Sequence, residues 1–310
     1  MFDVQRTEYA GPARLRAMQR LSSRLCPETS WRHAGDLAWA ATCAGDPAQG
    51  PTALWCDGGE VVAWGWLEGP GELTLQVDAR RPELAGEVLA WAEGAGPEPV
   101  GTTISGNEPH IAAALAARGY RTPVPADGPF FSCLGHDLTN LPPVPALPAG
   151  YTVRQCDAAQ VADRAAAHRA AWSAWGSSYS EYQHAAMRGL WPYKPEFDLL
   201  AVAADGTPAA YYQGWYDEES RVGHFEPVGT HPEHLRRGLS RALGTELLHR
   251  FAAAGARLVT VTPRGDDAYP VARLTYASLG FTAFSRTYAY TQAVAHAGVQ
   301  VAAAAGAASN

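Results

Sequence analysis

The sequence predicts an α/β fold with mixed sheets, arranged as two tandem domains of similar design. Three observations support this prediction. Short apolar runs typical of strands alternate with segments of helical spacing along most of the 310 residues. A segment with four prolines in ten residues, 141–150, lies near the middle of the chain and resists both helix and central strand. The order of strands and helices before this segment repeats, more weakly, the order after it.

The composition restricts the class of protein. Hydrophobic residues make up 47% of the chain, and the net charge is −7 at pH 7. We therefore expect substantial cores and no general affinity for nucleic acid. No apolar run reaches the ~18 residues that a membrane span needs, and the N-terminus lacks a signal-peptide pattern. The five cysteines are scattered and form no CxxC pair, which indicates reduced thiols in a cytoplasmic protein.

We predict a first domain at 1–140, a linker at 141–150, a second domain at 151–292 and a low-complexity tail at 293–310. In the first half, turn residues at 57–59 separate expected strands, and glycines follow the apolar stripes of two expected helices. The expected elements are strands within 52–79, a helix at 81–96, and a strand, turn and helix within 101–120.

The second half has clearer patterns. Asp205 and Gly206 mark a hairpin turn, Gly255 follows a helical stripe, and Pro270 suits the first turn of a helix that Gly280 closes. The expected elements are a strand in 150–157, a helix in 158–175, three strands in 198–231, a helix from Ser240 to Gly255, a strand at 257–262, a helix at 269–281 and a strand at 285–292.

The stretch from His231 to Leu248 places three arginines around Gly238, where a helix begins. The first N–H groups of a helix have no partners inside the helix, and the helix dipole is positive there. A glycine-containing loop with flanking arginines at that point suits a pyrophosphate. The alternative is a solvated arginine cluster on an ordinary helix. Neither GxxxxGK[ST] nor GxGxxG occurs, so a nucleoside-triphosphate loop and a Rossmann site are unsupported.

Two motifs in the second half resemble those of the GNAT superfamily of acyl-CoA-dependent N-acetyltransferases. The loop "THPEHLRRGLS" and the late helix "ARLTYASLGF" occur in the family's order, with a helix and a strand between them. The matching positions are Pro232, Arg237, Gly238 and Ser240 in the loop and Ala272, Tyr276, Gly280 and Phe281 in the helix. Leu235 and Tyr269 depart from the family pattern, which usually has a polar residue and an asparagine there.

The resemblance implies two tandem GNAT-like domains, of which the first is degenerate. Its corresponding stretch, "DARRPELAGEVL", has no glycine pair after the arginines. Such an arrangement is similar to that of mycothiol synthase and its actinobacterial relatives. The resemblance also implies that acetyl-CoA binds as co-substrate without a metal. The coenzyme-binding residues would be Val228, Gly229, Thr230, Leu235, Arg236, Arg237, Gly238, Leu239, Ser240 and Arg241.

The implied reaction moves acetyl directly from acetyl-CoA to a primary amine. Tyr276 corresponds to the family's acid for the leaving thiolate. His224 and Glu226 share one strand face and are alternative bases. Pro227 cannot donate to a ladder, so it suits the bulge that the family has here, with the N–H near Val228 as the donor to the carbonyl.

The acceptor side is indicated by aromatic residues interspersed with carboxylates, which suit a small, cationic amine. The candidates are Trp172, Trp175, Tyr179, Trp191, Tyr212 and Trp215. For each of them, a place in the hydrophobic core is the alternative interpretation.

Other functions are also considered. No GxSxG elbow supports a hydrolase, and "HPEH" is not the zinc motif HExxH. An acyl-CoA-binding sensor or an inactive partner is the non-enzyme alternative, although neither needs Tyr276. Among enzymes, a mycothiol-type synthase, an antibiotic self-resistance enzyme and a protein N-acetyltransferase stay open. We expect a monomer or homodimer.

Overall fold

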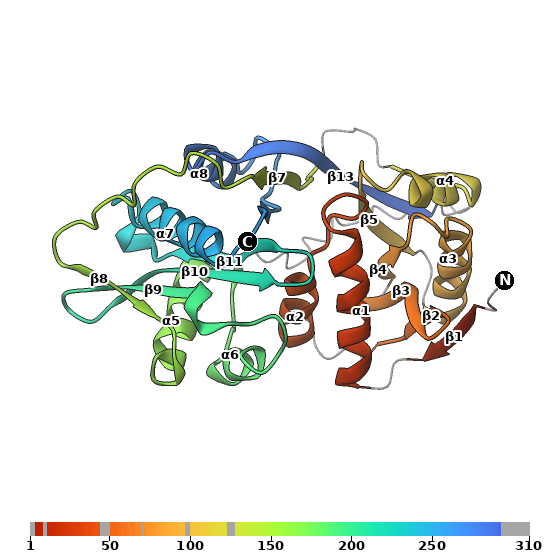
Figure 1. The fold of residues 1–310 in the computed structure, drawn as a ribbon, viewed down its shortest axis with the longest axis horizontal. Helices are drawn as coiled ribbons and strands as arrows, with labels where there is room; N and C mark the ends of the chain where they lie inside the picture. The colour runs from red at the N-terminus through yellow and green to blue at the C-terminus, as the bar shows by residue number, and fades with distance from the viewer. Residues whose placement is uncertain are drawn as a thin grey trace. The chain divides into compact units, whose positions relative to one another are not determined.

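The protein is described by a computed structural model for residues 4–8, 11–43, 50–69, 71–96, 100–122 and 128–292. The predicted tail, 293–310, lies outside these residues. Among the described residues, no helix is both long and apolar enough to cross a membrane. The described chain forms two compact units: unit 1 contains 4–34, 50–132 and 285–292, and unit 2 contains 35–43 and 133–284 (Figure 1).

Unit 1 is a mixed sheet with helices on its faces. Its strand order is β1-β2-β3-β4-β5-β13, and β6 pairs with the end of β13. Leucines and alanines of α3 and α4 pack on one face of this sheet and form its core. The elements are β1(Gln5–Glu8), α1(Pro12–Leu25), β2(Thr52–Asp57), β3(Glu60–Gly69), β4(Glu72–Val77), α3(Leu84–Ala95), β5(Gly101–Ser105), α4(Pro109–Ala117), β6(Tyr120–Arg121) and β13(Thr282–Gln292).

Unit 2 is a second mixed sheet, with the order β7-β12-β11-β10-β9-β8. Its strands are β7(Ser132–His136), β8(Tyr151–Gln155), β9(Asp198–Ala203), β10(Pro208–Asp217), β11(Val222–Thr230) and β12(Leu258–Val261). Its helices are α2(Ala34–Cys43), α5(Val161–Ala171), α6(Glu181–Met187), α7(Leu239–Ala253) and α8(Pro270–Ser278), with short 3₁₀ turns at Ala158–Gln160, Ser173–Trp175, Pro195–Phe197 and Pro232–His234. The expected strands and helices of this half are therefore found in the predicted order.

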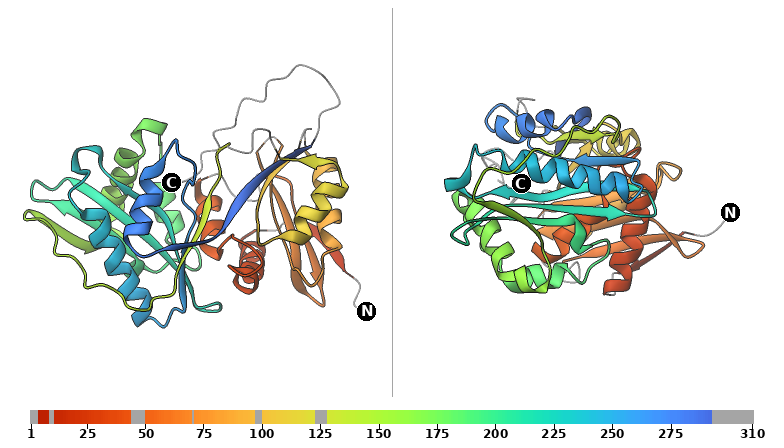
Figure 2. Two further views of the ribbon diagram at one scale, coloured as in Figure 1. Left: turned by 90° about the horizontal axis from the view of Figure 1, so that it is seen from above. Right: turned by 60° about the vertical axis from the view of Figure 1, so that its left-hand side comes forward.

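The sheet of unit 2 has two differently covered faces (Figure 2). Tyr212 and Phe225 pack with Phe251 of α7 and with the residues of α8, on what we call the α7 face. Tyr211 packs with Ala167 of α5 on the opposite side, the α5 face. Successive strand residues point to opposite faces, so His224 and Glu226 lie on the α5 face because Phe225 lies on the α7 face. The two faces therefore carry different side chains of the same strands.

Each sheet contains a strand from the other half of the sequence. β7 comes from the first half, yet it pairs with β12 in unit 2, with His136 opposite Val259. β13 comes from the second half, yet it pairs with β5 in unit 1, with Tyr288 opposite Ile104. The helix α2 also belongs to unit 2. The limits of the compact units therefore differ from the predicted limits of the two domains. The domain limits stay a prediction.

The proline-rich segment 141–150 has no regular secondary structure, as expected from its prolines. Leu141 and Leu147 nevertheless pack against the core of unit 2. The segment therefore lies along unit 2 and contributes apolar contacts to it.

Candidate functional site

The loop between β11 and α7 ends in a helix start with open backbone donors. Gly238 precedes α7 in the left-handed region, with φ +77°, and no side chain caps the helix there. Arg236 also has a positive φ, of 59°. The amides of Leu239, Ser240 and Arg241 have no carbonyl one turn earlier to bind, because they form the first turn. The loop residues 235–238 are exposed, so these donors lie beside an accessible surface.

The neighbouring predicted residues lie in different surroundings. Gly229 lies so close to α5 that a Cβ there would be 2.6 Å from Ala171 Cβ, so a side chain does not fit at this position. The hydroxyl of Ser240 lies 2.9 Å from that of Tyr212 and so points back to β10. Leu235 is 54% exposed and presents its side chain to solvent.

Beside this loop, β11 separates from one neighbour and bulges against the other. Its parallel pairing with β12 runs from Val222 to His224, opposite Leu258 to Thr260. Against β10, a register shift places Glu226 and Pro227 opposite the single residue Gln213. The irregularity predicted at Pro227 is confirmed. The result is a splayed end of β11 whose backbone groups are available next to the loop.

Tyr276 reaches the sheet from α8, on the α7 face. Its side chain is buried, stacks on Phe225 at a ring distance of 6.5 Å and meets Phe281 edge-on at 5.7 Å. Burial raises the pKa of Tyr276 well above its usual value. The hydroxyl is therefore protonated at neutral pH and can donate a hydrogen bond.

His224 is fully buried on the α5 face and has a partner at each ring nitrogen. Its Nδ1 lies 2.8 Å from Thr260 Oγ1, and its Nε2 lies 2.9 Å from Asp36 Oδ1. Asp36 belongs to α2, so a residue from the first half of the sequence reaches the strand that carries both predicted bases. Sequence reasoning missed Asp36, and no local pattern marks it, because 188 positions separate the two residues.

Glu226 lies two residues further along the same face and is 8% exposed. Its main-chain oxygen accepts a hydrogen bond of 2.5 Å from Trp215 Nε1. This contact holds the bulge, and it places the carboxylate at the splayed end of β11. Of the two predicted bases, Glu226 is the one next to the loop.

The predicted acceptor residues fall into separate groups. Trp172 donates to the Tyr211 hydroxyl at 2.7 Å and contacts Trp175, which is 59% exposed and meets Tyr269 at 5.6 Å. These aromatic residues form an accessible cluster between α5 and the start of α8.

The remaining aromatic candidates lie elsewhere. Tyr179 and Trp215 are buried with Trp39 in a core cluster on the α5 face. Trp191 is half-buried in the turn after α6. Tyr212 lies on the α7 face, away from Trp215. The structure therefore does not bring all six predicted residues together.

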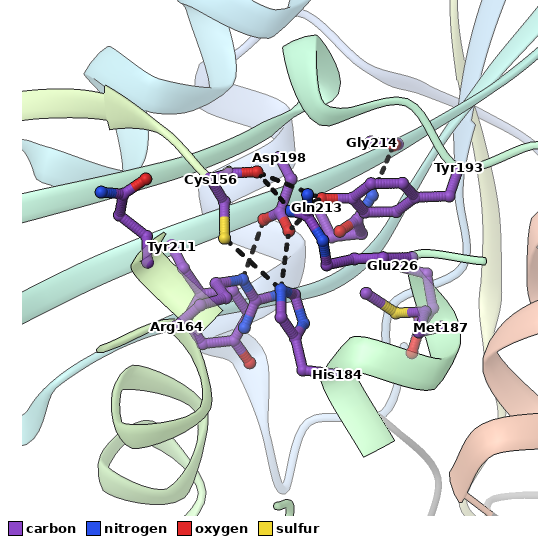
Figure 3. A network of polar contacts seen from close by, with 12 residues as sticks. Cys156, Arg164, His184, Met187, Tyr193, Asp198, Tyr211, Gln213, Gly214 and Glu226 are labelled. Carbon is purple, nitrogen blue, oxygen red and sulfur yellow. Dashed lines mark hydrogen bonds and ion pairs between the residues drawn. The ribbon is translucent and has the colours of Figure 1, made fainter. Parts of the chain in front are cut away.

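A buried polar network occupies the α5 face beneath α5 and α6 (Figure 3). Arg164 and Asp198 form an ion pair of 2.9 Å, and neither side chain is exposed. His184 Nε2 lies 3.5 Å from Asp198 Oδ2 and 3.4 Å from Cys156 Sγ. Burial lowers the pKa of His184 to about 2 and raises the pKa of Cys156. Both are therefore neutral at pH 7.

Cys156, His184 and Asp198 have ligand atoms within 4.8 Å of one another, a spacing that a metal ion could use. Arg164 already supplies a positive charge to Asp198, and the protonated thiol is a poor ligand. A cation there would have to compete with Arg164. These residues are better explained as an anchor for Arg164.

Like the start of α7, the start of α3 in unit 1 has no side-chain cap, but carboxylates lie beside it. Its two arginines are paired with carboxylates: Arg81 with Asp57 and Glu83, and Arg80 with Asp78. Glu83 itself is the N-cap residue of α3. A carboxylate at this place disfavours an anionic ligand, as expected for a degenerate copy.

Comparisons with known proteins identify the fold and a family match for part of the chain. Residues 164–281 match the model of the acetyltransferase (GNAT) family. Among solved structures, a tandem GNAT protein from the clavulanic acid biosynthesis pathway aligns with TM-score 0.63 at 20% identity, over 93% of this chain and 98% of that one. A GCN5-related N-acetyltransferase from Sphaerobacter thermophilus gives 0.60 at 20% identity, over 93% and 95%. A GNAT-family acetyltransferase from Colwellia psychrerythraea gives 0.62 at 12% identity, over 93% and 100%.

A search of curated proteins gave no match. At these identities the solved structures show the fold, and each of the three aligns over 93% of this chain. The chain therefore has a GNAT-like fold of mixed α/β sheets in a two-domain arrangement, and its segment 164–281 matches the acetyltransferase (GNAT) family.

Proposed function

We propose that the protein is an acetyl-CoA-dependent N-acetyltransferase that moves acetyl directly to a primary amine of a small, cationic molecule. The observation that carries this proposal is the open start of α7 after the splayed end of β11, together with the protonated Tyr276, whose ring stacks on Phe225 of β11. Thiol release from acetyl-CoA in the presence of an amine panel tests it directly. Binding without turnover would instead favour a sensor or an inactive partner.

In this proposal the amides from Arg236 to Arg241 hold the pyrophosphate, since they lie at a helix start that follows an exposed loop. Gly229 and Thr230 let the coenzyme arm lie along β11. The N–H of Val228 donates to the thioester carbonyl, where negative charge develops during attack. Tyr276 donates to the departing sulfur.

Glu226 is proposed as the base that takes the proton of the amine. His224 has both ring nitrogens engaged, one by Thr260 and one by Asp36, so it has no nitrogen directed at an incoming amine. Glu226 lies at the splay itself. His224 would then position the strand, with Asp36 fixing its ring.

Replacing Gly238 with valine is expected to weaken acetyl-CoA binding at least tenfold, measured by calorimetry, because a β-branched residue disfavours φ +77° and would turn the loop amides away. Wild-type protein should bind one coenzyme per chain. Gly206→Val is the matched control: Gly206 has φ +90°, and a Cβ there also meets nothing within 4 Å. Both variants should lose about 1–2 kcal/mol of stability, but only Gly238→Val should lose affinity. Equal affinity in the two variants would move the pyrophosphate away from this loop.

Replacing Tyr276 with phenylalanine is expected to lower kcat by roughly 10- to 100-fold, the worth of a hydrogen bond to a charged group. Acetyl-CoA affinity should change little, because the hydroxyl acts mainly as thiolate leaves. Steady-state kinetics and calorimetry measure the two effects. Tyr216→Phe is the control, since its hydroxyl donates to Ala254 O in the core of the same unit. Unchanged kcat in Tyr276→Phe would assign this tyrosine to the core alone.

A further inference from the structure

Polar side chains form a buried row across three strands of the α5 face. Asp198 of β9 is paired with Gln213 of β10, and Gln213 stands opposite the bulge that contains Glu226 of β11. Asp198 and Gln213 are fully buried, and Glu226 nearly so. The row therefore leads from the core of unit 2 to the proposed base.

Arg164 lies over this row with part of its hydrogen-bonding capacity unused. Its Nε donates to Asp198 at 2.9 Å, and its guanidinium carbon lies 3.7 Å from the centre of the Tyr211 ring. Its Nη1 and Nη2 are buried and have no hydrogen-bond partner among the described residues. Leaving buried donors unmatched costs free energy, and native proteins match most of them with protein, water or ligand.

Gln213 supplies a hydrogen-bond acceptor that complements the donors of Arg164. Its Nε2 donates to Gly214 O at 2.8 Å, and its Oε1 is buried without a partner among the described residues. Two open donors on Arg164 and one open acceptor on Gln213 thus occur on the same face, in the row that ends at Glu226 (Figure 3). A hydroxyl group or a primary amide satisfies both, because each can accept from an arginine and donate to a carbonyl oxygen.

The charges of the row determine which oxygen group fits. Arg164 and Asp198 neutralise each other, while His184 and the Cys156 thiol facing them are neutral. Glu226, ionised as a base, is balanced by the ammonium of the acceptor. A carboxylate on the acceptor would leave one buried negative charge without a partner, which is costly. A neutral oxygen group leaves the charges of the row balanced.

We propose that Arg164 and Gln213 form an acceptor subsite that selects amines carrying a neutral hydroxyl or amide group close to the nitrogen. The class comprises amino alcohols and amino amides, in preference to amino acids and plain alkylamines. This inference rests on the proposed acetyl transfer and on Glu226 as its base.

The test compares four end groups on one α-amino skeleton: hydroxymethyl, primary amide, carboxylate and methyl. Alanine-sized and phenylalanine-sized sets are used so that side-chain fit does not decide the result. Turnover is followed by thiol release, and binding to the CoA-loaded protein by calorimetry. The alcohol and the amide should exceed the methyl compound roughly 10- to 100-fold in kcat/KM and in affinity, the factor for a hydrogen bond to a charged donor. The carboxylate should be the poorest ligand.

Arg164→Lys keeps a positive charge beside Asp198 but removes the forked Nη donors. It should reduce the preference for alcohol and amide over methyl to within about threefold. Arg169→Lys, on the same helix, is the control and should keep the preference, because Arg169 is engaged by Tyr179 O. Circular dichroism and thermal melting show whether each variant folds. Gln213→Met removes only the hydrogen-bond acceptor of the subsite and provides a second test. It should also reduce the preference for alcohol and amide over methyl.

The outcomes separate this inference from the proposed function. Amides and alcohols that bind preferentially, with the preference lost in Arg164→Lys, support the subsite even if no acetyl is transferred, in which case the proposed function is wrong. Equal affinity for all four end groups, a preference for the carboxylate, or an unchanged preference in both variants would overturn the subsite. The subsite would also be overturned if neither the alanine-sized nor the phenylalanine-sized compounds bind.

Discussion

Glu226→Gln should lower turnover by about 10²- to 10⁴-fold, the usual contribution of a positioned general base. Glutamine has nearly the shape of glutamate and keeps the bulge, whose contact with Trp215 uses the main-chain oxygen. It cannot take a proton from an ammonium ion. Steady-state kinetics should show the loss in kcat, and calorimetry should show unchanged acetyl-CoA affinity because the carboxylate lies on the α5 face.

The pH dependence provides a second measurement. An ammonium must lose its proton before attack, so the wild-type rate should rise with pH until both acceptor and base are deprotonated. Glu226→Gln should remove the part of the increase in rate that is due to deprotonation of the base. Glu246→Gln serves as the control, since Glu246 forms a partly exposed pair with Arg250 on α7. If Glu226→Gln keeps the wild-type rate and profile, His224 becomes the base to test, through His224→Ala.

Asp198→Asn should destabilise the protein by about 3–5 kcal/mol, because it leaves the Arg164 charge buried without its counter-ion. Both side chains have 0% exposure, so water does not compensate for the loss. Tyr211 stacks on the guanidinium but supplies no full negative charge. Urea unfolding measures the change in the free energy of unfolding.

Asp267→Asn is the matched control for this prediction. Asp267 pairs with Arg273 at 2.9 Å, as Asp198 does with Arg164, but its side chain is 93% exposed. Exposed ion pairs contribute at most about 1 kcal/mol to the free energy of unfolding. A loss in Asp198→Asn no larger than in Asp267→Asn would show that Arg164 does not need this carboxylate, and would weaken the charge argument for the acceptor subsite.

The sequence predicted the features that depend on neighbouring residues. Gly238 before a helix, Pro270 in a first turn and the Asp205–Gly206 hairpin each follow from local backbone preferences, and the structure has them where expected. The GNAT-like fold is likewise confirmed. The pyrophosphate role of the loop and the roles of Glu226 and Tyr276 stay predictions.

Features that depend on distant residues were not predicted. Asp36 meets His224 only because α2 packs in unit 2, and no periodicity in the sequence encodes that choice. The placement of β7 and β13 in the other half's sheet is similarly non-local. One error of grouping could have been avoided: Tyr212 and Trp215 are three residues apart on a strand, and an odd spacing puts them on opposite faces.

The exchange of β7 and β13 makes the two halves of the gene inseparable. A cut within 141–150 would take β7 and α2 away from unit 2, and would take β13 away from unit 1. Each fragment would then carry an unpaired strand edge, which favours aggregation. The first half can therefore lose every feature of a coenzyme site and still be retained by selection, because the second half cannot complete its sheet or orient His224 without it.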